Sequence, residues 1–144
     1  MPFFTVIIPL YNKEKYVENV LKSILNQTFT DFEVLIVNDC STDKSVSKIE
    51  SYLSEKVRLI HHEKNKGLSA TRNTGIKNAS ANYVTYLDAD DLWKPTFLET
   101  IHRLITNFPE AKIYGTNYEE IYGEKILKPH NGSDSLTISF EGII

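Results

Sequence analysis

The sequence predicts an α/β domain built on a mostly parallel central sheet flanked by helices, and three observations lead to this class. Apolar, β-branched runs of strand length alternate along the chain with segments of helical periodicity. Several of these runs are apolar at successive positions, as expected of strands that are covered on both faces. The chain has 144 residues and 41% hydrophobic content, enough to bury one core but not two.

Five runs are predicted to be strands because they are short, apolar and rich in β-branched residues. In chain order they are Phe4–Leu10, Glu33–Val37, Val57–His62, Tyr83–Leu87 and Ala111–Thr116. After them, Asn117–Tyr122 and Lys125–Lys128 flank a Gly-Glu pair and predict a small hairpin. Repeated strand–helix alternation favours right-handed connections between parallel strands.

The first two connecting segments carry the apolar spacing of one helix face. In the first, the face consists of Val17, Val20, Leu21 and Ile24. In the second it consists of Val46, Ile49 and Leu53, with Ser41 or Thr42 as the expected cap.

The later connections differ in quality. Leu68–Ala79 contains several poor helix formers, so it fits either a functional segment or a short irregular connector. The last helix has Pro95 in its first turn. Its core-facing residues are expected to be Leu98, Ile101, Leu104, Ile105 and Phe108.

Charge and cysteine content exclude some classes of protein. The 16 basic and 19 acidic residues are spread along the chain, which disfavours a nucleic-acid-binding surface. Cys40 is the only cysteine and cannot form an intrachain disulfide, which favours a reducing, cytoplasmic setting. The apolar N-terminus is too short to span a bilayer and lacks basic residues, so we expect a buried strand and no signal peptide. The apolar end at Ser139–Ile144 suggests a longer polypeptide, through which the protein could attach to the cytoplasmic face of a membrane.

Polar residues follow four of the predicted strands. The strand ends lead into Asn12, Asp39, the segment 61–67 and Asp88. In a parallel sheet these ends lie along one edge, where open α/β sheets bind their ligands. The sequence therefore predicts one site at this edge.

The strongest chemical signal is the acidic group Asp88, Asp90 and Asp91. Carboxylates this close repel one another unless a cation or hydrogen bonds offset the charge. At a strand end, Asp88 and Asp90 are two residues apart and point to the same side. Such oxygen ligands suit Mg²⁺ or Mn²⁺. The alternative is that Asp90 or Asp91 caps the following helix.

Three further residues are candidates for ligand binding. Asp39 has other helix caps beside it, so its carboxylate is available to accept hydrogen bonds from ring N–H groups of a base; uracil and guanine fit equally. Arg72 suits a phosphate or carboxylate, or is a surface arginine. Tyr11 stacks on a base or packs in the core.

Other residues carry weaker signals. His61 and His62 alternate faces on a strand, and no Cys or His cluster completes a zinc site. Trp93 could cover a sugar face, but packing is the preferred interpretation. His102 is expected at a core boundary. The usual glycine-rich dinucleotide and phosphate-binding motifs do not occur.

Four motifs, in order and spacing, resemble the family 2 glycosyltransferases of the GT-A fold. They are TVIIPLYNKEKYV at Thr5–Val17, QTFTDFEVLIVNDCSTD at Gln27–Asp43, NKGLSATRNTGI at Asn65–Ile76 and YLDADDLWKP at Tyr86–Pro95. The resemblance extends over about the first 110 residues. It implies a Rossmann-like GT-A fold, with residues 1–116 as the donor-binding core and 117–144 as the start of a truncated acceptor-side region.

The resemblance also implies an activity, which is inverting sugar transfer from a nucleotide diphosphate sugar, with a UDP-sugar favoured. The acceptor would be a saccharide or a lipid-linked saccharide, in cell-surface polysaccharide synthesis. By this resemblance Pro9, Tyr11 and Asp39 hold the base and Arg72 lies near the nucleotide. Asp88 contacts ribose or metal, and Asp90 ligates an Mn²⁺ or Mg²⁺ ion that bridges the diphosphate.

The catalytic base remains unassigned. Inverting transfer needs a group that takes the proton of the acceptor hydroxyl. In the family this carboxylate comes from the acceptor-binding half, beyond the matching motifs. The late acids in no matching motif are Glu119, Glu120, Glu124, Asp134 and Glu141. We therefore expect this chain to bind the donor without efficient transfer on its own.

Rival classes fit the sequence less well. A receiver domain needs acids after the first strand and a phosphoacceptor Asp after the third, where His61, His62 and Glu63 stand. A sugar nucleotidyltransferase usually carries a glycine-rich loop after the first strand, and Tyr11–Glu14 lacks glycine. A binding-only module derived from a transferase remains open.

Overall fold

The computed structural model describes residues 1–122 and 125–127 of the chain. The chain divides into two compact units, residues 1–96 and 97–144. The first unit contains the central sheet, and the second begins with a long helix.

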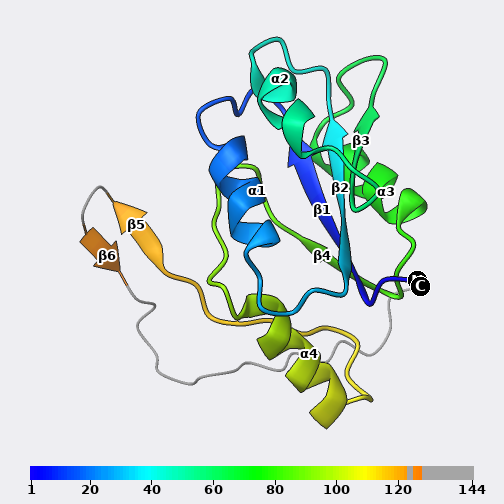
Figure 1. The fold of residues 1–144 in the computed structure, drawn as a ribbon, viewed down its shortest axis with the longest axis vertical. Helices are drawn as coiled ribbons and strands as arrows, with labels where there is room; N and C mark the ends of the chain where they lie inside the picture. Colours follow the sequence, from blue (N-terminus) through cyan, green and yellow to red (C-terminus); the bar gives the residue numbers. More distant parts are fainter. Residues whose placement is uncertain (123–124, 128–144) are drawn as a thin grey trace. The chain divides into compact units, whose positions relative to one another are not determined.

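The first unit is built on one parallel sheet, which confirms the predicted α/β class. Its strands are β1 (Phe4–Leu10), β2 (Phe32–Asn38), β3 (Val57–His61) and β4 (Tyr83–Tyr86), in the order β3-β2-β1-β4 (Figure 1). All residues of β1 and β2 are buried, whereas the edge strands β3 and β4 are partly exposed. The apolar runs of the central strands reflect this cover on both faces.

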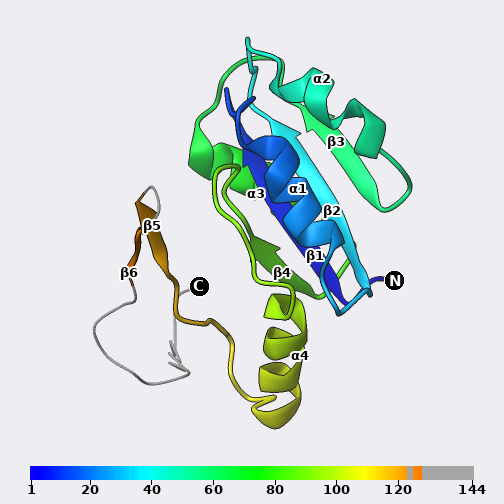
Figure 2. The same cartoon turned by 60° about the vertical axis from the view of Figure 1, so that its left-hand side comes forward.

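Helices cover both faces of the sheet. The helix α1 (Val17–Leu25) contacts α2 (Ser45–Ile49), which continues into the 3₁₀ turn η1 (Glu50–Tyr52). The helix α3 (Leu68–Asn78) packs on β1 and β2, on the other side of the sheet from α1 (Figure 2). Right-handed connections explain this arrangement because the chain runs outward from β1 to β3 and then returns to β4.

The predicted face of α1 is correct, since its four apolar residues are all buried. The second helix is shorter than predicted, and Leu53 lies beyond it with 39% of its surface exposed. Neither Ser41 nor Thr42 caps α2. Ser41 Oγ accepts a hydrogen bond from Asn12 N, and Thr42 N donates to Asn12 Oδ1, so both residues fasten the loop after β1. Asp43 Oδ1 instead accepts from Ser45 N at 2.9 Å.

The segment Leu68–Ala79 forms the full helix α3 although it contains several poor helix formers. The alternative of a short irregular connector is therefore wrong. A Cβ on Gly75 would lie 2.5 Å from Cγ2 of Ile7. Only glycine therefore allows α3 to approach β1 this closely, and the packing offsets the low helix propensity. The buried residues of this helix are Thr71 and Gly75.

In the second unit, α4 (Phe97–Asn107) buries Leu98, Ile101 and Ile105, as predicted. Leu104 is half-buried, and Phe108 follows the helix with 44% exposure, so the predicted face was too long. The strands β5 (Glu120–Tyr122) and β6 (Lys125–Leu127) pair antiparallel and confirm the small hairpin. Lys128, assigned to the hairpin from the sequence, lies outside the described residues.

The predicted strand Ala111–Thr116 is wrong, because this segment has no strand structure. The Tyr114 hydroxyl donates towards the carbonyl oxygens of Phe108 (2.7 Å) and Ala111 (3.0 Å), which gives a local turn after α4. Ile113 is 51% exposed, as it would not be in a covered strand. Among the described residues no helix is long and apolar enough to cross a bilayer.

Candidate active site

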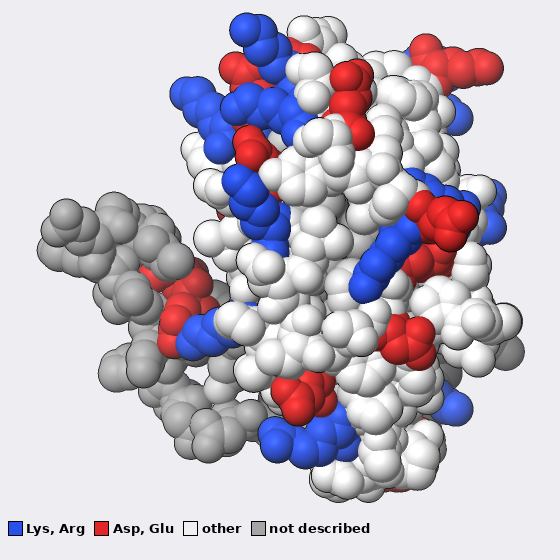
Figure 3. Space-filling view, viewed as in Figure 1, with Lys and Arg blue, Asp and Glu red and all other residues white. Residues whose placement is uncertain are grey.

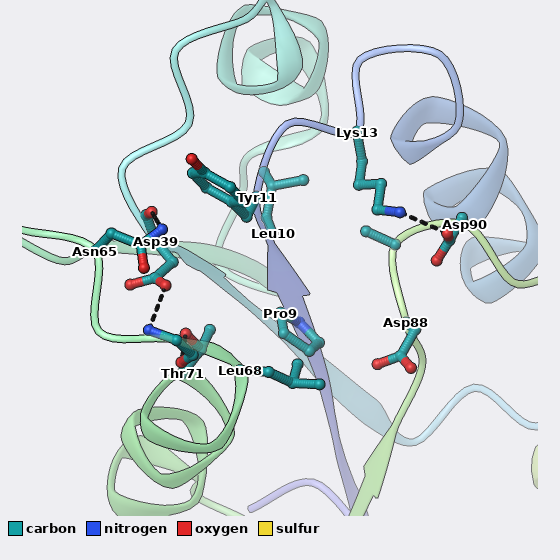
Figure 4. A pocket seen from close by; sticks show the side chains of 12 residues that line it. Pro9, Leu10, Tyr11, Lys13, Asp39, Asn65, Leu68, Thr71, Asp88 and Asp90 are labelled. Atoms are coloured by element: carbon teal, nitrogen blue, oxygen red, sulfur yellow. Dashed lines mark hydrogen bonds and ion pairs between the residues drawn. The ribbon is translucent and has the colours of Figure 1, made fainter.

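A pocket of about 360 Å³ opens at the carboxyl edge of the sheet (Figure 4). Its wall comes from the ends of β1, β2 and β4 and from the start of α3. It lies where the strand order reverses between β1 and β4, the usual ligand position in such sheets. The lining residues are Pro9, Leu10, Tyr11, Lys13, Asp39, Asn65, Gly67, Leu68, Thr71, Asp88, Ala89 and Asp90.

One end of the pocket is acidic. Asp88 and Asp90 both line it, on the same side in Figure 4. Asp90 Oδ2 lies 2.6 Å from Nζ of Lys13, and Asp88 Oδ1 lies 2.8 Å from Nη2 of Arg72. The two carboxylate side chains are each 42% exposed, so both remain open to solvent.

Local contacts explain how these acids are held. The hydrogen bond from Lys13 to Asp90 raises the pKa of Lys13. The Lys13 backbone N–H donates to Ser45 Oγ at 2.8 Å, which fixes the loop after β1. Asp91 N donates to the carbonyl oxygen of Asp88, and desolvation together with its acidic neighbours raises the pKa of Asp91.

The capping interpretation of these acids is wrong. The helix α4 begins at Phe97, too far along the chain for Asp90 or Asp91 to act as its cap.

The other end of the pocket contains a buried carboxylate, Asp39, which is 3% exposed. Its Oδ1 accepts from His62 Nδ1 at 2.7 Å and from Lys66 N at 2.8 Å. Its Oδ2 accepts from Gly67 N at 2.8 Å. Burial raises the pKa of Asp39, but these hydrogen bonds outweigh burial, so the pKa lies below its usual value.

Two other predicted residues are near this pocket in different ways. Tyr11 lines the pocket and is 49% exposed, so the core-packing alternative is wrong. Arg72 is not among the lining residues. Its Nη2 donates to Asp88 Oδ1, and its Cζ lies 5.5 Å from the ring centre of Tyr86. Its Nε is buried and has no hydrogen-bond partner among the described residues.

The histidines have structural partners. His62 is buried, and its Nε2 lies 2.8 Å from Thr74 Oγ1. His61 Nδ1 lies 3.2 Å from Asn38 Nδ2. Within the described part of the chain, no three His, Cys, Asp or Glu side chains are grouped as a metal site. A metal here would take its remaining ligands from water or from a bound molecule.

Trp93 is half-buried, does not line the pocket, and donates from its backbone N–H to Ser23 Oγ. His102 is half-buried, as predicted.

Sequence reasoning missed Lys13 and Asn65 as pocket residues. Both lie in polar segments at strand ends, and this position is the signal by which they could have been found from the sequence. Nothing in the sequence indicated that His62 would bind Asp39.

Charged side chains outside the pocket are mixed in sign. Lys and Arg lie beside Asp and Glu over much of the face in Figure 3. This pattern agrees with the even spread of charge along the sequence.

Comparisons with known proteins identify the family. The sequence model of glycosyl transferase family 2 matches residues 5–141. Glycosyltransferase GlyA of Streptococcus pneumoniae serotype 4 is 43% identical over 133 residues, which are 91% of this chain and 19% of that protein. The chain thus spans about a fifth of this relative's length.

Solved structures agree in fold. S. aureus TarS in complex with UDP-GlcNAc superposes with a TM-score of 0.71 and 33% identity, covering 74% of this chain and 32% of that chain. The mannosyltransferase PcManGT from Pyrobaculum calidifontis, in complex with GDP-Man and Mn²⁺, gives a TM-score of 0.67 and 28% identity, covering 72% and 32%. These structures have the GT-A fold, which the parallel sheet of this chain shares. The chain belongs to glycosyl transferase family 2.

Proposed function

We propose that this chain binds a nucleotide diphosphate sugar, with a UDP-sugar favoured, as the donor-binding part of an inverting glycosyltransferase. The acceptor would be a saccharide or lipid-linked saccharide in cell-surface polysaccharide synthesis. In this proposal residues 1–116 form the donor-binding core and 117–144 begin the acceptor side. The protein would act in the cytoplasm, at or near the cytoplasmic face of the membrane.

One observation carries the proposal, namely that a single pocket has two chemically different ends. Asp39 and Tyr11 lie at one end, and Asp88 and Asp90 at the other (Figure 4). A buried acceptor beside an exposed aromatic ring suits a base. Two open carboxylates suit a cation that accompanies a diphosphate.

The acidic end fits Mn²⁺ or Mg²⁺. Mg²⁺ is usually bound by one or two carboxylates together with substrate phosphates and waters. Asp88 and Asp90 supply two carboxylates on one side of the pocket, and the described residues offer no larger ligand group there. When bound, such a cation neutralises charge that develops on the leaving diphosphate.

The remaining residues bind and orient. Pro9 and Tyr11 border the base end, and Asp39 accepts an N–H of the base. Lys13 pairs with Asp90 and Arg72 pairs with Asp88. As cations, both suit the phosphates of a diphosphate that would bind beside these acids. No residue is assigned as the catalytic base. Glu119 and Glu120 belong to the second unit, and the later acids lie outside the described residues.

Thermal unfolding with nucleotide diphosphates, with and without Mn²⁺, tests the proposal. UDP should stabilise the chain, and Mn²⁺ should increase that stabilisation, because binding to the folded state raises the unfolding temperature. Asp90→Ala should abolish the metal-dependent part. The matched control is Asp31→Ala, which removes an exposed carboxylate away from the pocket.

Two results would contradict the proposal. An absence of stabilisation by any nucleoside diphosphate would exclude a donor site. An unchanged metal dependence in Asp90→Ala would remove Asp90 from its proposed role.

A binding-only module is the second candidate, because no catalytic base is assigned to the chain. Measuring sugar transfer from a nucleotide sugar to a range of acceptors tests whether the chain carries out transfer by itself. We expect donor binding without turnover at ordinary enzyme rates. Robust transfer would show that the chain contains its own base.

A further inference from the structure

We propose that Gln27 positions the acidic end of the pocket for a divalent cation. Its side-chain amide holds the segment 91–96, which follows Asp90, against the C-terminal end of α1. Gln27 is a positioning residue, because it does not line the pocket and acts on Asp90 only through this segment. The inference rests on the proposed function, since it concerns the cation that would accompany the diphosphate.

The loop between β4 and α4, residues 87–96, has no helix or strand of its own. Its first part is anchored by burial, because Leu87 and Ala89 are 4% and 2% exposed. Leu87 N also donates to the carbonyl oxygen of Ile7 at 3.1 Å, which continues the pairing of β4 with β1. Asp88 lies between the two buried residues and is therefore held on both sides.

Asp90 is held less firmly by its own part of the loop (Figure 4). It lies in a turn that Asp91 N closes by donating to the carbonyl oxygen of Asp88 at 3.0 Å. Beyond this turn, all residues of the segment 91–96 except Trp93 are exposed. A segment with so few buried side chains opens easily unless hydrogen bonds hold it. The direction in which the turn presents Asp90 therefore depends on hydrogen bonds to the rest of the chain.

Lys13 does not provide this support when a cation is bound. Its Nζ lies 2.6 Å from Asp90 Oδ2, but the two side chains are 36% and 42% exposed, and solvent screens such a pair. A cation on Asp90 would also repel the ammonium group of Lys13. Another contact must therefore fix the carboxylate in the metal-bound state.

The buried amide of Gln27 provides this contact. Gln27 is 4% exposed, and its Nε2 donates to the carbonyl oxygens of Ser23 (3.1 Å) and Lys94 (2.8 Å). Ser23 belongs to α1 and Lys94 to the loop, so a single amide group joins the two. Beside it, Thr28 N donates to the carbonyl oxygen of Pro95 at 2.9 Å. Both hydrogens of the Gln27 amide are thus in use, and the loop is fastened four residues after Asp90.

Removing the amide should disturb cation binding more than base binding. Groups that hold metal ligands in place typically change metal affinity by about 10- to 100-fold when they are removed. The base end of the pocket takes Tyr11 and Asp39 from the ends of β1 and β2, and not from this loop. The loss should therefore fall on the metal-dependent part of nucleotide binding.

Isothermal titration of the 144-residue chain with UDP, in Mn²⁺ and in chelator, tests the inference in Gln27→Met. This substitution keeps a long side chain and removes the donor. The ratio of the UDP affinity in Mn²⁺ to that in chelator should fall by on the order of 10-fold, with the affinity in chelator unchanged. Deuterium uptake by the backbone amides of residues 91–96 should rise in the same variant, because the segment opens more often.

The matched control is Thr5→Val. Thr5 is fully buried, and its hydroxyl donates to Glu33 at the amino edge of the sheet, away from the loop. The control should lower the free energy of unfolding and leave the affinity ratio at the wild-type value. A merely structural role of Gln27 would lower the affinity in chelator as much as that in Mn²⁺. That result, or an equal fall of the ratio in Thr5→Val, would overturn the inference.

A second variant covers a failure of Gln27→Met to fold. Ser23 Oγ accepts from Trp93 N at 3.4 Å, in the same attachment of the loop to α1. Ser23→Ala should lower the affinity ratio about 2-fold, since this bond is long and its loss is small. An unchanged ratio in Ser23→Ala, or in folded Gln27→Met, would overturn the inference.

The wild-type chain separates this inference from the proposed function. If the wild type binds UDP more tightly in Mn²⁺ and Gln27→Met does the same to an equal degree, only the role of Gln27 is lost. If the wild type binds no nucleoside diphosphate in either condition, the proposed function is lost. Binding of UDP that is equal in Mn²⁺ and in chelator would overturn both the proposed cation site and the role of Gln27.

Discussion

The two edges of the parallel sheet hold acidic side chains in opposite ways. At the amino edge Glu33 is 7% exposed and accepts from Thr5 Oγ1 (2.7 Å), Ser80 N (2.7 Å) and Arg58 Nη2 (2.9 Å). At the carboxyl edge Asp88 and Asp90 are each paired with one cation and are 42% exposed.

The carboxylate group thus serves two purposes at the two edges. A carboxylate whose acceptor positions are filled by the chain's own donors joins strands and loops. A carboxylate that keeps open positions can bind a ligand. Asp39 combines both, since it is buried like Glu33 yet lines the pocket. Each of the following predictions tests whether the amino edge serves stability and the carboxyl edge serves binding.

The largest effect is expected for Glu33→Ala. Removing this carboxylate leaves the Ser80 N–H and Thr5 hydroxyl at a buried site without their acceptor. We expect a loss of about 3 kcal/mol in the free energy of unfolding, measured by urea denaturation. Nucleotide affinity of the folded variant should remain that of the wild type.

The control is Glu33→Gln, which keeps one acceptor oxygen and should lose less stability. A loss below about 1 kcal/mol in Glu33→Ala would show that the amino edge does not depend on this carboxylate. A large fall in nucleotide affinity would contradict the assignment of the amino edge to stability alone.

A smaller loss, of about 2 kcal/mol, is expected for Gly75→Ala because the new methyl group would overlap Ile7. The same helix contributes Leu68 and Thr71 to the pocket, so a shift of α3 should also weaken nucleotide binding. This variant should therefore lower both the stability of the fold and the affinity for nucleotide. Urea denaturation and titration with UDP measure the two effects.

A double-mutant cycle separates overlap from helix propensity. In an Ile7→Ala background, Gly75→Ala should cost much less, because the overlapping atoms are absent. An equal cost in both backgrounds would show that Ile7 is not the cause.

Much of the fold could be predicted from the sequence because the sheet leaves a strong local signal. The apolar runs of β1 and β2 indicate burial on both faces, and strand order then brings Asp39, Asp88 and Asp90 to one pocket. The segment Ala111–Thr116 is of strand length but contains Lys112 and Gly115, and it has no strand partner in the described chain. Local composition does not show whether a partner exists.

Partnerships between distant residues could not be predicted. Asn12 engages Ser41 and Thr42 from 29 and 30 positions away, which removes them as caps of α2. His62 reaches Asp39 only because β2 and β3 pair in register. These contacts depend on tertiary packing and leave no periodic pattern in the sequence.

Glu33 at the amino edge should also make the free energy of unfolding depend on pH in the acid range. Burial raises the pKa of Glu33, but hydrogen bonds from Ser80, Thr5 and Arg58 outweigh it, so the pKa lies below 4.5. A lowered folded-state pKa contributes stability above the unfolded value, and that stability is lost as pH falls through the folded value. The unfolding free energy should therefore fall below pH 4.5, with a shallower slope in Glu33→Gln. Equal slopes in urea titrations between neutral and acidic pH would exclude this contribution.

The smallest effect is expected at the carboxyl edge, for Asp90→Ala without metal or nucleotide. The bond between Asp90 and Lys13 is exposed, and solvent screens such pairs, so we expect a change within about 0.5 kcal/mol by urea denaturation in chelator. Asp91→Ala is unsuitable as a control because Asp91 feels the charge of Asp90; Asp31→Ala serves instead. A loss approaching that of Glu33→Ala would mean that Asp90 holds the fold together. A nearly unchanged free energy of unfolding, together with a loss of metal-dependent binding, would mean that the open acceptor positions of this carboxylate serve the ligand.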